Sequence, residues 1–298
     1  MNKVPEYLKP GDLVVIIATA RKTTLEAIQP AINILLEWGL KVELGLNVFK
    51  AEHQFAGSDS QRAADLQWAI NHKTAKAIIV TSGGYGTIRI IDQVNFKPLQ
   101  KNPKWFIGYS DVTVMHNRLH NLKLASIHGT MAFQFAKNKE ATLTLKQLLF
   151  GKKIKYDIAI HKLNRPGIAE AEIVGGNLSI LYAVSGSIDD IDTKNKILFI
   201  EDLDEYLYHI DRMMLQLKRS DKLKNLKGLI VGGMSQMKDN TVPFGKTAEE
   251  IILDAVKEYN YPVCFNFPAG HVENNRAIYF GKKAKFIVTK GKVALNYI

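Results

Sequence analysis

Cysteine is almost absent from this 298-residue sequence, which contains only Cys264. A single cysteine excludes an internal disulfide and agrees with a reducing compartment. Because Cys264 lies in an apolar, strand-like run, we expect a buried, unreactive thiol rather than a nucleophile.

Long hydrophobic runs are also missing. No apolar segment approaches the roughly 20 residues that a membrane-spanning helix needs. Residues 1–7 carry neither the basic region nor the apolar core of a signal peptide. We therefore expect a cytoplasmic protein with no membrane partner.

Basic residues exceed acidic ones, with 40 Lys and Arg against 29 Asp and Glu and a formal net charge of +11. Such a charge is compatible with nucleic-acid binding, but the lysines are scattered and form no basic stripe interleaved with aromatic residues. We therefore expect no nucleic-acid partner. The charge is interpreted as a solvated surface that helps to attract anionic small molecules.

Metal-binding motifs are incomplete. His116 and His120 are one helical turn apart, as in zinc-binding helices, but Asn117 stands where that motif has its glutamate and no third ligand is apparent. The acidic cluster at residues 202–205 lacks the glycine and the regular spacing of a calcium loop. We expect no metal and no cofactor.

Apolar runs alternate with helical patterns along the first half of the chain. Strands are expected at residues 11–19, 41–46, 77–80, 105–108 and 125–130, and helices at residues 25–36, 60–72, 88–94 and 143–150. This alternation predicts an N-terminal α/β domain over residues 1–150. Its parallel sheet would be doubly wound and flavodoxin-like, with right-handed crossovers.

A lysine-rich segment with a Pro-Gly pair, residues 151–168, is expected to be a linker. Beyond it, strands are expected at residues 171–174, 197–200, 228–233 and 263–267 and within 277–298, and helices at residues 178–184, 206–217 and 247–259. Residues 169–298 therefore predict a smaller C-terminal domain of mixed α/β type.

Ser110 follows the expected strand 105–108 and precedes a helical pattern that begins at Val112. A sharp strand-to-helix turn exposes the side-chain hydroxyl of its serine, as in many enzymes with a serine nucleophile. The first free amides of the following helix point toward negative charge that develops beside that hydroxyl. The alternative is an ordinary helix N-cap, a position that serine often occupies.

A glycine-rich loop, residues 83–86, follows the expected strand 77–80. Chemistry in parallel sheets gathers at the carboxyl ends of the strands, where this loop and Ser110 both fall. The loop lacks the spacing of the nucleotide-binding motifs. Glycines there would bring bare amides close to a substrate oxyanion, and the alternative is a tight turn without a ligand.

Two polar residues of the second half stand at strand ends. Glu201 follows the run 197–200, and His271 follows the last of the expected strands before the tail. An imidazole and a carboxylate there could serve Ser110 as general base and orienting group. Taken singly, each residue has a simpler interpretation: Glu201 could be a solvated charge, and His271 could be an ordinary turn residue. His128 is expected to be buried and structural.

Seven motifs in this order resemble those of the LD-carboxypeptidase family of serine peptidases (S66), which also contains microcin C immunity peptidases. They are Gly83-Gly84-Tyr85-Gly86, Gly108-Tyr109-Ser110-Asp111, His128-Gly129, Gly175-Gly176-Asn177-Leu178, Glu201-Asp202, Asp211-Arg212 and Gly270-His271.

The resemblance implies a triad that spans two domains, with Ser110 as nucleophile, His271 as base and Glu201 as the orienting partner. It implies an oxyanion hole made by the backbone amides of Gly84 and Asp111. It also implies a reaction without a metal, and a homodimer.

Two further residues are candidates for binding the substrate. They are Tyr85, in the glycine-rich loop, and Arg212, whose planar guanidinium suits a substrate carboxylate but could equally make local helix contacts.

The implied reaction is hydrolysis of the L,D-amide bond to the C-terminal D-amino acid of murein tetrapeptide, with release of D-alanine in peptidoglycan recycling. Thr130, where members often have proline, and Asn275-Arg276-Ala277 depart from the family pattern and leave the substrate open. One alternative is an immunity peptidase that cleaves peptidyl or aminoacyl nucleotides of the microcin C type. Another is a two-domain binding protein that closes on a small molecule without chemistry.

Overall fold

Most apolar runs of the first half become strands of one six-stranded sheet in the computed structural model, which describes residues 2–298. The strands are β1 (Leu13–Ile17), β2 (Lys41–Leu44), β3 (Ala75–Val80), β4 (Trp105–Gly108), β5 (Ser126–His128) and β10 (Ile278–Phe280), in the order β10-β5-β4-β3-β1-β2. Strands β1 to β5 pair in parallel, whereas β10 pairs antiparallel with β5. The predicted parallel sheet is confirmed, and the C-terminal tail supplies its edge strand.

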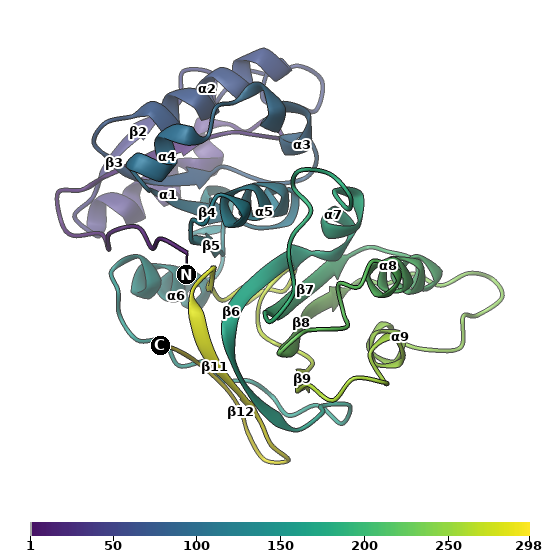
Figure 1. The fold of residues 1–298 in the computed structure, drawn as a ribbon. Coiled ribbons are helices and arrows are strands. Elements are labelled where there is room, and N and C mark those ends of the chain that lie inside the picture. The colour runs from purple at the N-terminus through teal and green to yellow at the C-terminus, as the bar shows by residue number, and fades with distance from the viewer. Residues whose placement is uncertain (1) are drawn as a thin grey trace.

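Helices cover both faces of this sheet (Figure 1). They are α1 (Leu25–Glu37), α2 (Asp59–Asn71), α3 (Thr87–Ile90), α4 (Lys97–Lys101), α5 (Thr113–Asn121) and α6 (Lys139–Leu149). Successive residues of β1 alternate between two apolar cores. Val15 and Ile17 pack with residues of α2 and α5, and Val14 and Ile16 pack with residues of α1 and α6. Because both faces of such a parallel strand are covered, its sequence is a continuous apolar run.

The second half of the chain forms a mixed sheet that nearly closes on itself. Its strands are β6 (Gly167–Asn177), β7 (Ile197–Leu203), β8 (Gly228–Ser235), β9 (Val263–Cys264), β11 (Lys283–Val288) and β12 (Val293–Tyr297), in the order β12-β11-β6-β7-β8-β9. Strands β6 to β9 run parallel, and β11 is antiparallel to both neighbours. Arg165, just before β6, forms an antiparallel bridge to Val263 of the edge strand β9, and so joins the chain at the start of β6 to that strand across the curved sheet.

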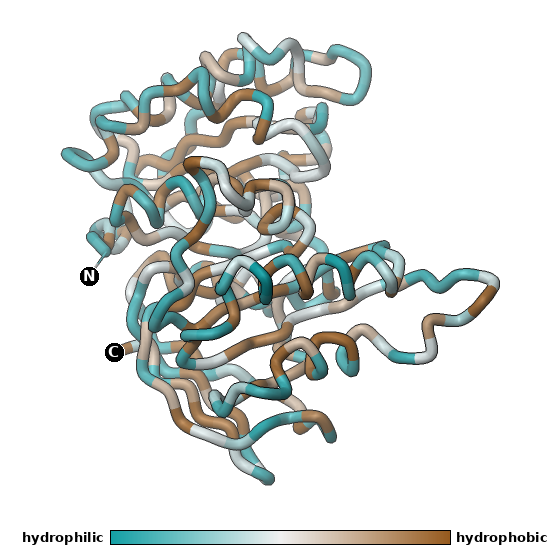
Figure 2. Tube along the Cα trace, turned by 45° about the vertical axis from the view of Figure 1, so that its right-hand side comes forward, coloured by the Kyte–Doolittle hydropathy of each residue, from teal (hydrophilic) through white to brown (hydrophobic). Residues whose placement is uncertain are grey.

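Three helices, α7 (Leu178–Ala183), α8 (Leu207–Arg219) and α9 (Ala248–Ala255), belong to this domain. Ile210, Met213, Met214 and Leu217 of α8 are buried at helical spacing. Figure 2 shows apolar residues concentrated on the strands and on the inner helix faces, while the projecting loop between β8 and α9 is mainly polar.

Within residues 2–298, no helix combines the length and the apolar character that crossing a membrane requires.

Several elements are shorter than the sequence predicts, among them α9, which ends at Ala255 where the sequence predicts a helix to residue 259. The expected helix 88–94 is α3 followed by a 3-10 turn at Ile91–Gln93. The expected strand 263–267 ends at Cys264, because Asn266 has a positive φ of 56° and turns the chain out of the sheet. That turn starts the loop that leads to His271.

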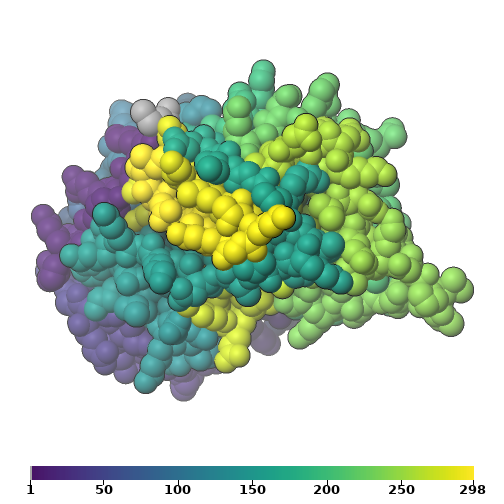
Figure 3. All heavy atoms as spheres, turned by 90° about the horizontal axis from the view of Figure 1, so that it is seen from below, coloured from purple at the N-terminus to yellow at the C-terminus, as the bar shows by residue number. Residues whose placement is uncertain are grey.

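The segment expected to be a linker contains no helix or strand over residues 152–166. It packs against the C-terminal strands, as Figure 3 shows from below. The hydroxyl of Tyr156 donates to the carbonyl of Ala277 at 2.7 Å and lies 3.1 Å from that of Tyr297. The predicted limits of the linker and of the two domains stay a prediction.

Candidate active site

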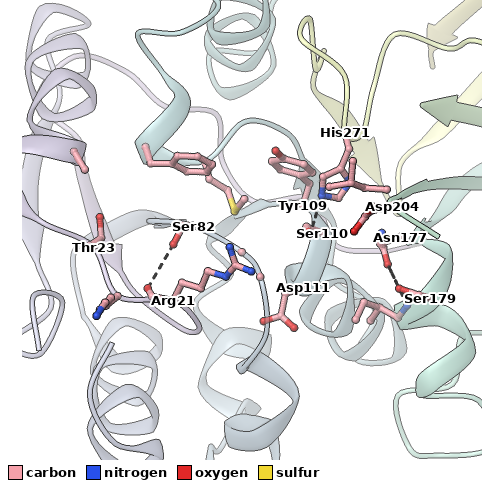
Figure 4. A pocket seen from close by; sticks show the side chains of 18 of the residues that line it. Arg21, Thr23, Ser82, Tyr109, Ser110, Asp111, Asn177, Ser179, Asp204 and His271 are labelled. Carbon is pink, nitrogen blue, oxygen red and sulfur yellow. Dashed lines mark hydrogen bonds between the residues drawn. The ribbon is translucent and has the colours of Figure 1, made fainter. Parts of the chain in front are cut away.

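Ser110 lies at the turn from β4 into a 3-10 turn, Ser110–Val112, that leads into α5. Its φ is +63°, a conformation that costs free energy for a residue with a side chain and is often found at functional sites. Gly108 lets the turn close, since a Cβ there would lie 2.8 Å from Cγ2 of Val112. The fold therefore holds this serine in a strained turn that presents its hydroxyl to a cleft (Figure 4).

A hydrogen-bonded chain joins Ser110 to two residues of the C-terminal domain. Nε2 of His271 lies 3.1 Å from Oγ of Ser110, and Nδ1 of His271 lies 2.6 Å from Oε2 of Glu201. Ser110 and His271 are 161 residues apart in sequence. The structure thus brings together the serine, histidine and glutamate that the sequence singled out, in the order a nucleophile, base and orienting acid require.

A bulge and a glycine position Glu201. The pairing of β7 with β8 shifts register between Ile200 and Asp202, so that Glu201 stands at a β-bulge, a feature that often re-aims a side chain beside an active site. Gly270 has a φ of +98°, and a Cβ there would lie only 2.6 Å from the Cβ and Cγ atoms of Glu201. Glycine at this position is therefore required for the 265–271 loop to pass over the carboxylate.

The charge of this buried carboxylate acts on His271. Burial alone would lower the pKa of His271, but the hydrogen bond and the negative charge of Glu201, together with the charge of Asp202, outweigh it and raise that pKa above its ordinary value. Glu201 has an exposed fraction of 0%. The arrangement therefore favours the protonated imidazole that forms when a base takes the proton of a serine.

Asp202 is the second buried acid of this strand. Burial, and then the charge of Glu201, raise the pKa of Asp202 to about 7. Its carboxylate accepts hydrogen bonds from Nδ2 of Asn177 and from the backbone N–H of Ser179, each at 2.9 Å. Asp202 therefore ties the end of β7 to the start of α7.

The glycine-rich loop lies directly against the nucleophile. A Cβ on Gly83 would lie 3.2 Å from Cβ and 3.4 Å from Oγ of Ser110. Within residues 2–298, the N–H of Gly84 donates no hydrogen bond, and both Gly84 and Asp111 line the cleft beside Ser110. Both residues whose amides are predicted to form an oxyanion hole thus line the cleft, and the oxyanion hole itself stays a prediction.

The side chain of Asp111 has a separate task. It is 1% exposed, and its Oδ2 accepts a hydrogen bond from the backbone N–H of Thr87 at 2.8 Å. Burial raises the pKa of this carboxyl, against the lowering effect of that hydrogen bond. Asp111 therefore connects the serine turn to the start of α3, which follows the glycine-rich loop.

The cleft between the two domains has a volume of about 1060 Å³. Its lining is polarised, since Arg21 and Lys22 contribute positive charge from the N-terminal domain and Asp204 and Glu205 contribute negative charge from the C-terminal domain. Sequence patterns did not indicate Arg21 as a residue of the site. The signal that could have revealed it is its place just beyond the carboxyl end of β1, where parallel sheets bind their ligands.

The two predicted substrate-binding residues are not part of this cleft lining. Tyr85 is 47% exposed and its ring lies against Phe55, with the ring centroids 6.2 Å apart. Arg212 lies on α8 in another cavity, and its guanidinium carbon is 5.2 Å above the ring of Tyr208. Helix geometry explains its position, because the apolar residues of α8 take the inner face and Arg212 is left outside.

Three further histidines of the N-terminal domain, His116, His120 and His128, are buried. His116 makes hydrogen-bond contacts with Oγ of Ser126 at 2.8 Å and with the carbonyl of Gly108 at 2.9 Å. Burial lowers the pKa of both His116 and His120 to about 4, so both rings are neutral. His128 is 0% exposed, which confirms the expectation of a buried residue. In the described part of the chain, no group of three or more His, Cys, Asp or Glu residues is arranged to hold a metal ion.

Comparison with known proteins gives matches along most of the chain. Residues 14–129 match the LD-carboxypeptidase N-terminal domain, and residues 170–286 match the LD-carboxypeptidase C-terminal domain. The protein named "Probable murein peptide carboxypeptidase" from Bacillus subtilis (strain 168) is 36% identical over 296 residues, which cover 95% of this chain and 91% of that protein.

Solved structures show the same architecture. The crystal structure of muramoyltetrapeptide carboxypeptidase from Oxalobacter formigenes superimposes with a TM-score of 0.86 at 27% identity, over 96% of this chain and 98% of that chain. The MccF-like protein from Bacillus anthracis str. Ames has a TM-score of 0.86 at 23% identity, over 99% of both chains, which shows a shared fold.

Proposed function

We propose that this chain, which belongs to the LD-carboxypeptidase family, is a serine hydrolase. Its substrate is murein tetrapeptide, in which it cleaves the amide bond to the C-terminal D-amino acid. The observation that carries the proposal is the hydrogen-bonded chain from Ser110 through His271 to Glu201 at the cleft between the domains. The relatives named for murein peptides support the choice of substrate. A role in cytoplasmic peptidoglycan recycling and assembly as a homodimer are part of the proposal.

The chemistry follows from the contacts. Oγ of Ser110 attacks the carbonyl carbon of the penultimate residue while Nε2 of His271 takes the hydroxyl proton, and the carbonyl oxygen becomes an oxyanion. The N–H groups of Gly84 and Asp111 stabilise that charge. The C–N bond then breaks as His271 gives its proton to the leaving nitrogen, which departs as a free D-amino acid.

Water completes the cycle. The remaining peptide is held on Ser110 as an ester, and a water molecule that gives a proton to His271 attacks the ester carbonyl. Collapse of the second tetrahedral intermediate returns that proton to Oγ of Ser110 and releases the shortened peptide. Throughout, Glu201 holds the ring through Nδ1 and stabilises its positive form.

A second candidate keeps the same residues and changes the substrate to a peptidyl or aminoacyl nucleotide. The residues that line the cleft support this second candidate. Phe49 and Phe133 supply aromatic surface suited to a nucleotide base, and Asp204 and Glu205 supply acidic groups suited to a ribose. A protein that only binds a small molecule would not need the strained serine and its base.

The test is release of D-alanine from purified murein tetrapeptide, followed by mass spectrometry, with Ser110→Ala and His271→Ala in parallel. We expect both variants to lose activity by at least about 10³-fold while they remain folded. Ser60→Ala, which removes an exposed serine outside the cleft, is the matched control and should behave as the wild type.

Three results would contradict parts of the proposal. Full activity in Ser110→Ala would exclude the covalent mechanism. Cleavage of a peptidyl nucleotide without cleavage of the tetrapeptide would move the function to the second candidate. If the folded wild type cleaved neither and Ser110 resisted a serine-directed reagent, a binding protein would be the remaining interpretation.

A further inference from the structure

The guanidinium of Arg21 lies in the cleft without an internal partner. Within residues 2–298, it forms no ion pair and donates no side-chain hydrogen bond, although the residue lines the cleft and is exposed there. Figure 4 shows its side chain extending along the cleft toward Ser110. An unpaired guanidinium beside a nucleophile is free to bind an anionic group of a substrate.

The backbone and stem of Arg21 are held in place. The main chain at Arg21 forms an antiparallel bridge with Phe55, and the hydroxyl of Ser82 donates to the Arg21 carbonyl at 3.5 Å. The stem packs on Gly84, where a Cβ would lie 2.3 Å from Nε and 2.7 Å from Cδ of Arg21. Gly84 therefore leaves room for the arginine to cross the loop whose amide borders the nucleophile.

The position relative to Ser110 follows from two adjacent glycines. Ser110 lies against Gly83 and Arg21 lies against Gly84, and consecutive α-carbons are about 3.8 Å apart. Ser110 and the Cδ–Nε part of the Arg21 side chain thus contact neighbouring residues of one loop.

The geometry of a peptide substrate matches this order. In a trans peptide bond the carbonyl oxygen and the α-carbon of the next residue lie on the same side of the C–N bond. When the oxygen points to the amide of Gly84, the leaving residue and its terminal carboxylate are therefore on that side too. The carboxylate carbon is only three bonds from the attacked carbonyl carbon, so it falls on the side of the cleft that holds Arg21.

The charges of the cleft allow this orientation and disfavour the reverse. Arg21 and Lys22 are the Lys and Arg residues of its lining, whereas Glu205 and Asp204, the latter paired with Lys238, lie on the opposite wall and disfavour a carboxylate. The other two acids of the lining, Asp111 and Asp202, are buried. Of the two cations, Arg21 has the planar fork that binds a carboxylate through two parallel hydrogen bonds.

We propose that Arg21 binds the free carboxylate of the C-terminal D-amino acid and so restricts cleavage to the last bond of the peptide. This inference rests on the proposed function. It assigns to Arg21 a role in substrate specificity that is separate from the covalent chemistry of Ser110.

The experiment compares murein tetrapeptide with the same peptide carrying a C-terminal carboxamide, in the wild type and in Arg21→Met. The wild type should prefer the acid by roughly 50-fold in kcat/KM, because hydrogen bonds to charged groups are worth more than those to neutral ones. Arg21→Met should lose most of that preference, by slowing cleavage of the acid and leaving cleavage of the amide nearly unchanged. Arg21→Lys should retain part of it.

Two further variants control for charge. Arg219→Met removes the same charge from an exposed site outside the cleft and should keep the full preference for the acid. Loss of the preference in Lys22→Met with its retention in Arg21→Met would overturn the assignment to Arg21. An equal fall for acid and amide in Arg21→Met would also overturn it, because the effect would then not involve the carboxylate.

Failure of the proposed function gives a different result. A folded wild type that cleaves neither peptide overturns the proposed function and this inference with it. Cleavage by the wild type with an unchanged acid preference in Arg21→Met overturns the inference alone.

Discussion

Oε2 of Glu201 accepts two hydrogen bonds from His271, one from ring Nδ1 at 2.6 Å and one from the backbone N–H at 3.1 Å. A single oxygen atom therefore fixes both the ring and the main chain of the base. With Nδ1 carrying the proton, Nε2 is left to accept the hydroxyl proton of Ser110. This double contact makes the carboxylate, rather than the turn alone, responsible for the orientation of the imidazole.

Replacement of Glu201 by glutamine should separate orientation from packing. The amide has nearly the same shape, but its NH₂ group can face Nδ1 and stabilise the wrong tautomer of His271. We expect kcat to fall by about 10³- to 10⁴-fold with little change in thermal stability. Steady-state kinetics and a melting curve of Glu201→Gln measure the two effects, and near-normal kcat would show that the carboxylate has no orienting role.

The pH dependence should follow the raised pKa of His271. The base works only when it is neutral, so kcat/KM rises as the pH passes upward through that pKa. The negative charge of Asp202 contributes to the increase, so Asp202→Asn should move the rise toward lower pH. Asp221→Asn, a carboxylate change outside the cleft, is the control, and an upward shift in Asp202→Asn would contradict this assignment.

Gly270→Ala and Gly245→Ala form a matched pair. Both glycines have positive φ, +98° and +84°, but a Cβ on Gly270 would contact Glu201 while one on Gly245 meets nothing within 4 Å. Gly245→Ala should cost about 1 kcal/mol of unfolding free energy from backbone strain. Gly270→Ala should cost about 2–4 kcal/mol and also reduce kcat, since the carboxylate must move. Urea titrations and activity assays compare them, and equal costs would show that the contact with Glu201 is unimportant.

Thr113 tests the contact between the two domains. Its Oγ1 accepts a hydrogen bond from the backbone N–H of Asn177 at 2.9 Å, and Thr113 is 0% exposed. Thr113→Val keeps the shape and leaves that buried N–H without a partner, which should cost about 1–3 kcal/mol. Thr113→Ser keeps the acceptor and should cost less. Denaturant titration ranks the two variants, and the reverse order would mean that the methyl group matters more than the hydrogen bond.

The sequence was sufficient for most of the helices and strands and for naming candidates for the site. Ser110 and Glu201 stand at or near the carboxyl ends of strands, where a parallel sheet places its functional groups, so the pattern of apolar runs made them candidates. Their expected roles came from the resemblance to the LD-carboxypeptidase family. The contact between His271 and Ser110 could not be derived in this way. It depends on the left-handed turn at Asn266 and on the docking of two domains, neither of which has a periodic signal.

Candidates for substrate binding were harder to predict, for a physical reason. Arg212 belongs to an amphipathic helix, and only the docking of that helix decides which surface its polar face borders. Arg21 lies in a stretch without a motif, and its place in the cleft depends on a glycine 63 positions later that leaves space for its side chain. Contacts of this kind arise from tertiary packing, which a local pattern does not encode.

The antiparallel pairing of β10 with β5 has a consequence for synthesis on the ribosome. The N-terminal domain emerges with one edge of its sheet open, and residues 278–280 fill that edge only after residues 151–277 have been synthesised. At about 5–20 residues per second, translation of residues 151–280 leaves the edge unpaired for roughly 7–26 s. An open edge is a site for unwanted pairing with other chains, so this protein should depend on chaperone protection more than its final stability suggests. The same delay keeps Ser110 without its base in every nascent chain that ends before residue 271.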